Sequence, residues 1–115
     1  MRVYVAATAE AVKRLLSSEV TFDEYLTPDQ FEFDPGVGEE EREHLVSLLA
    51  ADDALELNGG KIGLVLAADL SESQLNGAAI TLKFSQIASL LISEDGEELS
   101  WFAPEEIAHQ IDEWL

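Results

Sequence analysis

Two histidines are the side chains best suited to acid–base chemistry in this sequence, because an imidazole changes charge near neutral pH. His44 follows Glu40 by four residues, and His109 follows Glu105 by the same spacing. On a helix this spacing places both members of a pair on one face, where the carboxylate stabilises the charged imidazole. An exposed helix face explains both pairs, so we assign no catalytic residue and do not favour an enzyme.

Clusters of carboxylates offer the oxygen ligands that magnesium and calcium prefer. Asp69 and Glu72 stand near the end of an expected strand, and other clusters lie within residues 34–41, 52–53 and 94–98. None has the spacing of an EF-hand loop, and a solvated charged surface accounts for them. The sequence therefore predicts no specific metal site. A divalent-metal or small-molecule binder that uses surface carboxylates, with or without enzyme activity, remains an alternative.

The motifs of several other chemistries are missing. The chain has no cysteine, which excludes disulfides, thiolate nucleophiles and zinc-thiolate sites. Gly59-Gly60-Lys61 matches part of a phosphate-binding loop, but neither serine nor threonine follows Lys61. We accordingly predict no bound cofactor.

One acidic segment, residues 22–34, interleaves large apolar side chains with carboxylates. Aromatic side chains supply binding energy at protein interfaces, and the charges around them steer the encounter. The competing interpretation is that these aromatic rings complete the hydrophobic core. The candidate interaction surface consists of Tyr25, Phe31, Phe33, Glu39, Glu40 and Glu41.

The charge of the chain limits its partners. It has 24 Asp and Glu against 6 Lys and Arg, a formal net charge of −18 at pH 7. Such an excess repels phosphate backbones and anionic lipids, which argues against direct binding to nucleic acid or to a membrane surface. We favour a non-enzymatic protein-interaction or regulatory module that binds a basic protein surface. A nucleic-acid mimic and an adaptation to salt or solubility are further alternatives.

Local patterns predict the elements that must position these residues. Residues 2–7 form an apolar strand, and Thr8 caps a helix that follows it. A second strand is expected over 20–28 and a loop over 30–38, after which three glutamates begin a second helix. This helix stops at Asn58-Gly59, or else residues 55–64 form a hairpin around that dipeptide.

The second half of the chain shows mainly strand patterns. Residues 61–70 contain an almost uniformly apolar strand that suits a central position, and residues 80–84 alternate as a half-exposed strand does. A two-residue turn at Asp95-Gly96 would place Leu90 opposite Trp101 and Ile92 opposite Leu99. A last helix begins at Pro104, and it carries one apolar stripe, formed by Ile107, Ile111 and Trp114, that we expect to dock on the sheet.

These elements predict one compact domain over residues 1–115, of the α+β class. We expect a two-layer mixed β-sheet with two or three helices packed mainly on one face, and a ferredoxin-like order in the first half. The apolar stretches are too short for a signal peptide or a membrane span, so we expect a cytoplasmic protein. A homodimer through an edge strand or the last helix is compatible with this architecture.

Four segments carry a family resemblance: Met1–Thr8, the tetrapeptide Tyr25-Leu26-Thr27-Pro28, Val65–Leu70 and Ile87–Ser93. Together they resemble an uncharacterised family of small actinobacterial proteins, over roughly residues 1 to 95. Ala6 stands where that family carries proline. The family is a domain of unknown function, so the resemblance implies an actinobacterial cytoplasmic setting and brings no catalytic residue, cofactor or substrate.

Overall fold

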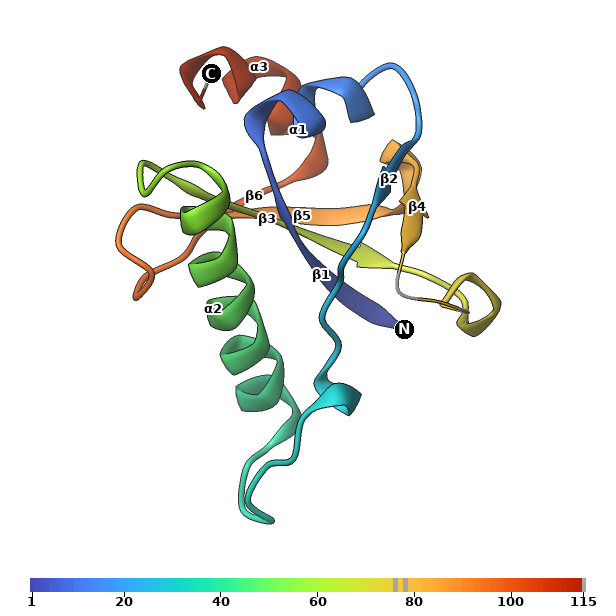
Figure 1. The fold of residues 1–115 in the computed structure, drawn as a ribbon, viewed down its shortest axis with the longest axis vertical. Helices are drawn as coiled ribbons and strands as arrows, with labels where there is room; N and C mark the ends of the chain where they lie inside the picture. Colours follow the sequence, from blue (N-terminus) through green and yellow to red (C-terminus); the bar gives the residue numbers. More distant parts are fainter. Residues whose placement is uncertain (76, 78, 115) are drawn as a thin grey trace.

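The computed structural model describes residues 1–75, 77 and 79–114, and the side chains of all of these except Trp114. The described residues form three α-helices and six strands, of which β3 to β6 follow one another without an α-helix between them (Figure 1). The helices are α1 (Ala9–Leu15), α2 (Glu39–Leu57) and α3 (Pro104–Trp114). The strands are β1 (Arg2–Ala7), β2 (Val20–Phe22), β3 (Gly63–Asp69), β4 (Ile80–Leu82), β5 (Ile87–Ser93) and β6 (Ser100–Phe102). Single 3₁₀ turns are η1 (Pro28–Gln30), η2 (Glu72–Gln74) and η3 (Phe84–Gln86).

The strands form two antiparallel sheets, and the predicted α+β class is confirmed. The larger sheet has the order β1-β3-β5-β6, while β2 pairs only with β4. The predicted mixed sheet and the ferredoxin-like first half are therefore wrong. The seven residues of α1 span only about 10 Å, whereas the six residues of β1 span about 20 Å. A helix this short does not carry the chain back along the full length of β1, and β2 does not join the sheet that contains β1.

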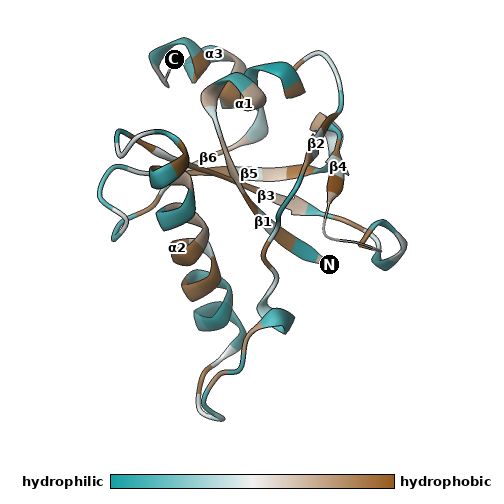
Figure 2. Ribbon diagram, viewed as in Figure 1, coloured by the Kyte–Doolittle hydropathy of each residue, from teal (hydrophilic) through white to brown (hydrophobic). Residues whose placement is uncertain are grey.

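Helices cover both faces of the larger sheet, with α1 and α3 on one face and α2 on the other, whereas packing mainly on one face was predicted. The central strand β3 sends Leu64 and Leu66 into a core shared with α1, α3, β2 and β4. Its alternate residues Val65 and Ala67 point into a second core under α2. Because both faces of β3 are buried, its sequence is apolar at nearly every position, as predicted for a central strand. Figure 2 shows these hydrophobic strands at the centre and hydrophilic residues on the peripheral loops.

The ends of α1 and α2 follow local signals in the sequence. Thr8 Oγ1 accepts the Ala11 N–H at 3.1 Å and caps α1 as predicted. Helix α2 begins with three glutamates in its first turn, where the helix dipole favours negative charge. It ends at Leu57 and is capped by Asn58, whose side-chain amide donates to the carbonyl oxygens of Ala54 at 2.8 Å and Ala7 at 3.0 Å. Residues 52–58 are therefore the end of a helix, and the alternative hairpin is wrong.

The register between β5 and β6 differs from the prediction by one residue. Leu90 pairs with Phe102 and Leu91 with Trp101. The turn is longer than two residues because side chains hold it: Ser93 Oγ accepts the Gly96 N–H at 2.7 Å, and Asp95 accepts the N–H groups of Glu97 and Glu98. The shift turns Trp101 to the α2 side of the sheet, where its side chain is 62% exposed.

Two of the remaining strands are shorter than expected, whereas the last helix docks as expected. Strand β2 ends at Phe22 rather than near Pro28, and Phe84 lies in η3 rather than in a strand. Helix α3 packs on α1 and β5 and buries Ile107 and Ile111, which confirms the predicted docking. The third member of the predicted stripe, the side chain of Trp114, lies outside the described residues.

Candidate interaction cleft

The predicted interaction residues lie in three different surroundings. Tyr25 packs against the core under α1, and its hydroxyl donates to the Gly77 carbonyl oxygen at 3.0 Å. Phe31 and Phe33 pack against the other core, under α2, with ring centroids 6.4 Å apart. Glu39, Glu40 and Glu41 are exposed on the first turn of α2, and the structure does not bring Tyr25 to the other aromatic rings.

Phe31 and Phe33 fix the long loop before α2 to that helix. Both rings are half-buried. The Arg42 guanidinium lies 5.7 Å from the centroid of the Phe33 ring, and its Nε donates to the Val37 carbonyl oxygen at 3.1 Å. A cation over an aromatic face is attracted by the negative charge of the ring. These contacts give the two phenylalanines a structural role in holding the loop.

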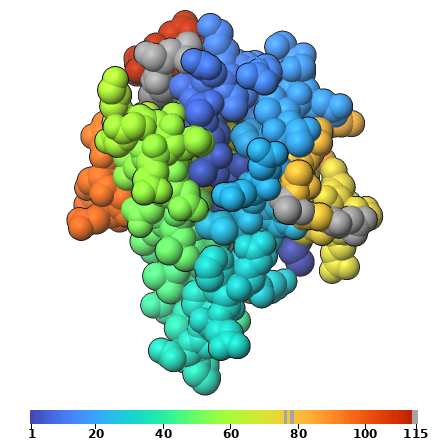
Figure 3. Space-filling model, viewed as in Figure 1, coloured from blue at the N-terminus to red at the C-terminus, as the bar shows by residue number. Residues whose placement is uncertain are grey.

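A cleft of about 400 Å³ opens beside Tyr25, near the start of the acidic segment formed by residues 22–34. It lies between α2 and residues 21–26, and β1 forms its floor. Figure 3 shows dark-blue atoms of β1 at the bottom of this hollow, between the green surface of α2 and the lighter blue of residues 21–26. The lining residues are Tyr4, Ala6, Thr21, Phe22, Asp23, Glu24, Tyr25, Leu26, Ala50, Asp53 and Leu57.

The cleft exists because residues 23–25 leave the edge of the sheet. Leu26 pairs with Tyr4 through two backbone hydrogen bonds of 2.9 Å, which is an isolated bridge to β1. Strand β2, a few residues earlier, pairs instead with β4. The chain between these two attachments therefore bends away from β1. The small side chains of Ala6 and Ala50 leave the opening unfilled.

The cleft combines an apolar floor with an acidic rim. Tyr4 is only 5% exposed, and Leu57 extends the apolar surface at the C-terminal end of α2 with 55% exposure. Burial raises the pKa of the Tyr4 phenol, and the negative charge of Glu43 adds to this effect. The phenol is therefore neutral at physiological pH. Three exposed carboxylates, Asp23, Glu24 and Asp53, stand around the opening.

Sequence reasoning found one side of this cleft and missed the rest. Asp23, Glu24 and Tyr25 belong to the acidic segment that the sequence singled out. Ala6 and Ala50 gave no signal, because small and apolar residues on a strand or helix are typical of a core. Leu57 was the one available hint, since it ends the apolar run of α2 directly before a predicted helix stop.

Asp69, Glu72 and the two histidines, which were considered for metal binding or acid–base chemistry, lie outside this cleft. Asp69 is held by Arg2 across paired strands, with Nε to Oδ1 at 2.7 Å and Nη2 to Oδ2 at 3.3 Å. This is the one ion pair among the described residues, so neither His44 nor His109 has a carboxylate partner there. In the same part of the chain, no three His, Asp or Glu side chains gather closely enough to hold a metal ion.

Comparisons with known proteins complete the description of the site. Neither a protein-family model, nor a curated protein, nor a solved structure matches the chain. None of the helices in the described part of the chain is both long and apolar enough to cross a membrane. The shape and charge of the cleft are therefore the basis for a functional hypothesis.

Proposed function

We propose that this protein is a non-enzymatic interaction module of the cytoplasm, and that its cleft binds a basic, partly apolar segment of a partner protein. The observation that carries the proposal is the acidic rim of Asp23, Glu24 and Asp53 around the apolar floor of Tyr4 and Leu57. Apolar contacts on the floor supply affinity, while the rim selects positive charge. The pairing of these two features at one opening suits a peptide that carries both kinds of side chain.

Electrostatics support a basic partner at two ranges. The net charge of −18 attracts a basic partner as it approaches, although salt at 0.1 M screens this field beyond about 10 Å. The rim acts at contact distance. An exposed ion pair contributes about 0.2–1 kcal/mol, so three rim carboxylates together contribute about 0.6–3 kcal/mol, or roughly 3- to 150-fold in Kd.

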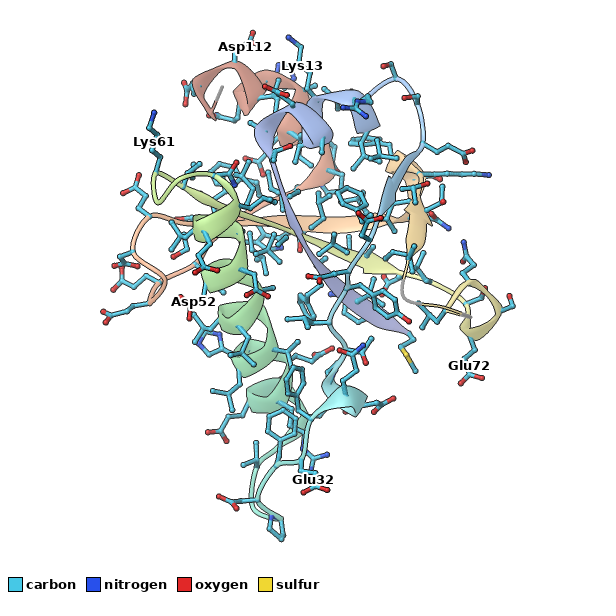
Figure 4. All side chains as sticks on the ribbon, viewed as in Figure 1. Lys13, Glu32, Asp52, Lys61, Glu72 and Asp112 are labelled. Carbon is cyan, nitrogen blue, oxygen red and sulfur yellow. The ribbon has the colours of Figure 1, made fainter. Side chains whose placement is uncertain are left out.

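The alternatives have less support. The bidentate contact with Arg2 occupies Asp69, which a site built from Asp69 and Glu72 would need as a metal ligand. A nucleic-acid mimic needs ordered rows of carboxylates at phosphate-like spacing. Asp112 on α3, Glu72 on η2, Glu32 in the loop before α2 and Asp52 on α2 lie on different sides of the molecule (Figure 4). This spread favours the protein-interaction module.

Selection from a phage-displayed library of random octapeptides tests the proposal. We expect the wild-type chain to enrich peptides that combine Lys or Arg with apolar residues. The triple variant Asp23→Asn/Glu24→Gln/Asp53→Asn should bind the selected peptides about 3- to 150-fold more weakly, measured by fluorescence anisotropy. These side chains are exposed and the variant carries less negative charge, so it should melt no lower than the wild type.

A matched control removes the same amount of charge elsewhere. The triple variant Glu94→Gln/Glu97→Gln/Glu98→Gln neutralises three exposed carboxylates of the loop between β5 and β6. It should retain peptide affinity within about twofold, because only the long-range field changes. Equal losses in both variants would mean that the net charge, and not the cleft, attracts the peptides. Failure to enrich basic peptides would refute the proposal.

Kinship with the uncharacterised actinobacterial family stays a prediction that adds no partner or substrate. The predicted homodimer is a separate matter from the cleft. Sedimentation of the purified chain over a range of concentrations tests it, and a mass that stays monomeric would contradict it.

A further inference from the structure

Strand β1 is an edge strand of the larger sheet, and alternate residues of it direct their backbone groups outward. The outward direction is fixed by Tyr4, whose N–H and C=O both pair with Leu26. In an antiparallel pair the backbone groups of successive residues point to opposite sides. Ala6, two residues after Tyr4, therefore also turns its N–H and C=O away from β3.

The outward groups of Ala6 have no partner among the described residues. If the pairing of Tyr4 with Leu26 continued by two residues, Glu24 would stand opposite Ala6. Residues 23–25 leave the edge instead, so the internal ladder ends after a single pair. Ala6 also lines the cleft, which places these unpaired groups at the base of the opening. Unpaired groups on an edge strand are a template for another strand.

We propose that the partner segment binds in the cleft as an added β-strand, exchanging two backbone hydrogen bonds with Ala6. This inference rests on the proposed function and specifies its mode of recognition. Successive side chains of an extended peptide point to opposite sides. One set contacts the apolar floor beside Tyr4, and the other reaches the carboxylates of the rim. The preferred peptide thus alternates apolar and basic residues, as is typical of strand addition to a sheet edge.

A scan of backbone methylation tests the hydrogen bonds directly. The tightest octapeptide from the selection above is synthesised with a methyl group on one backbone nitrogen at a time. An added strand loses affinity about five- to tenfold when the nitrogen that donates to the Ala6 carbonyl oxygen is methylated, and little at the other nitrogens. A loss confined to one nitrogen supports the inference. A uniform pattern overturns it.

Variants of Ala6 test the same bonds from the protein side. Ala6→Pro removes the N–H that would donate to the peptide, and proline is tolerated on an edge strand where that N–H faces outward. Affinity should fall about five- to tenfold. The control Ala6→Ser keeps the N–H and adds one oxygen, so its affinity should stay within about twofold. Unchanged affinity in a folded Ala6→Pro variant overturns the inference.

Hydrogen exchange covers the case in which Ala6→Pro does not fold. In the unaltered chain, the Ala6 amide proton should exchange at least tenfold more slowly after the octapeptide is added at saturation. Unchanged exchange, with binding that still depends on the acidic rim, overturns strand addition but leaves the proposed function standing. Peptide binding that does not depend on the rim overturns both.

Discussion

Gly63 provides the sharpest test of how α2 is placed against the sheet. A Cβ atom at this position would lie 2.8 Å from the Ala51 carbonyl oxygen, 3.2 Å from Leu55 Cγ and 3.4 Å from the Ser93 carbonyl oxygen. The first contact is with the backbone of α2, so the helix must move by several tenths of an ångström to accept even alanine. Gly63 is therefore needed for close approach of helix and strand.

The expected cost of Gly63→Ala follows from these contacts. Overpacking a core costs about 1–3 kcal/mol, and this variant meets backbone atoms on two neighbouring elements, α2 and β5. A loss of this size lowers the melting temperature of a domain of this length by roughly 5–15 °C. Thermal and urea unfolding followed by circular dichroism measure both quantities. Peptide affinity should fall too, because α2 forms one wall of the cleft.

Two other glycines distinguish the effect of steric crowding from the effect of backbone conformation. Gly36 has open space around the position of a Cβ and an ordinary φ, so Gly36→Ala should leave stability unchanged or raise it by about 0.5 kcal/mol. Gly60 also has open space, but its φ is +81°, so Gly60→Ala should cost about 1 kcal/mol from backbone strain. If Gly63→Ala is as stable as Gly36→Ala, the tight contact between α2 and β3 does not exist.

Two further predictions concern charge. Added sodium chloride should raise the free energy of unfolding, because screening relieves repulsion among 24 acidic residues that face only 6 basic ones. Urea unfolding at low and high salt measures this free energy. A lower stability at high salt would contradict the prediction. Burial raises the folded-state pKa of Tyr4, so its contribution to stability is present below the unfolded value of about 10 and is lost as the pH rises through the higher folded value. Tyr4→Phe should therefore lose less stability than the wild type between about pH 9 and 12, measured by urea unfolding. If the variant and the wild type lose the same stability over this range, the phenol is not buried as described.

Elements with local causes could be predicted closely. Strand β1 has the predicted bounds, and Thr8 caps α1 through a bond three residues away. Three glutamates and Asn58 mark the two ends of α2, because helix ends depend on groups within one turn. These signals need no knowledge of the rest of the chain.

Pairings that depend on distant residues could not be predicted. The register of β5 and β6 shifted by one residue because the side chains of Ser93 and Asp95 accept backbone N–H groups within the turn. Strand β2 was expected in one sheet with β1, yet it pairs with β4 in a separate sheet. A short apolar strand can complete either sheet, and only packing against the other elements selects one.

The sequence by itself determined the sign of the surface, the lack of cysteine chemistry and the α+β class, because composition and hydrophobic periodicity do not depend on how the elements are arranged. The tertiary structure decided where binding can occur. The cleft needs Ala6 on an edge strand, Ala50 and Asp53 on α2, and residues 23–25 bent away from β1. These residues come from distant parts of the chain, and an unpaired sheet edge arises only when the strand order is fixed.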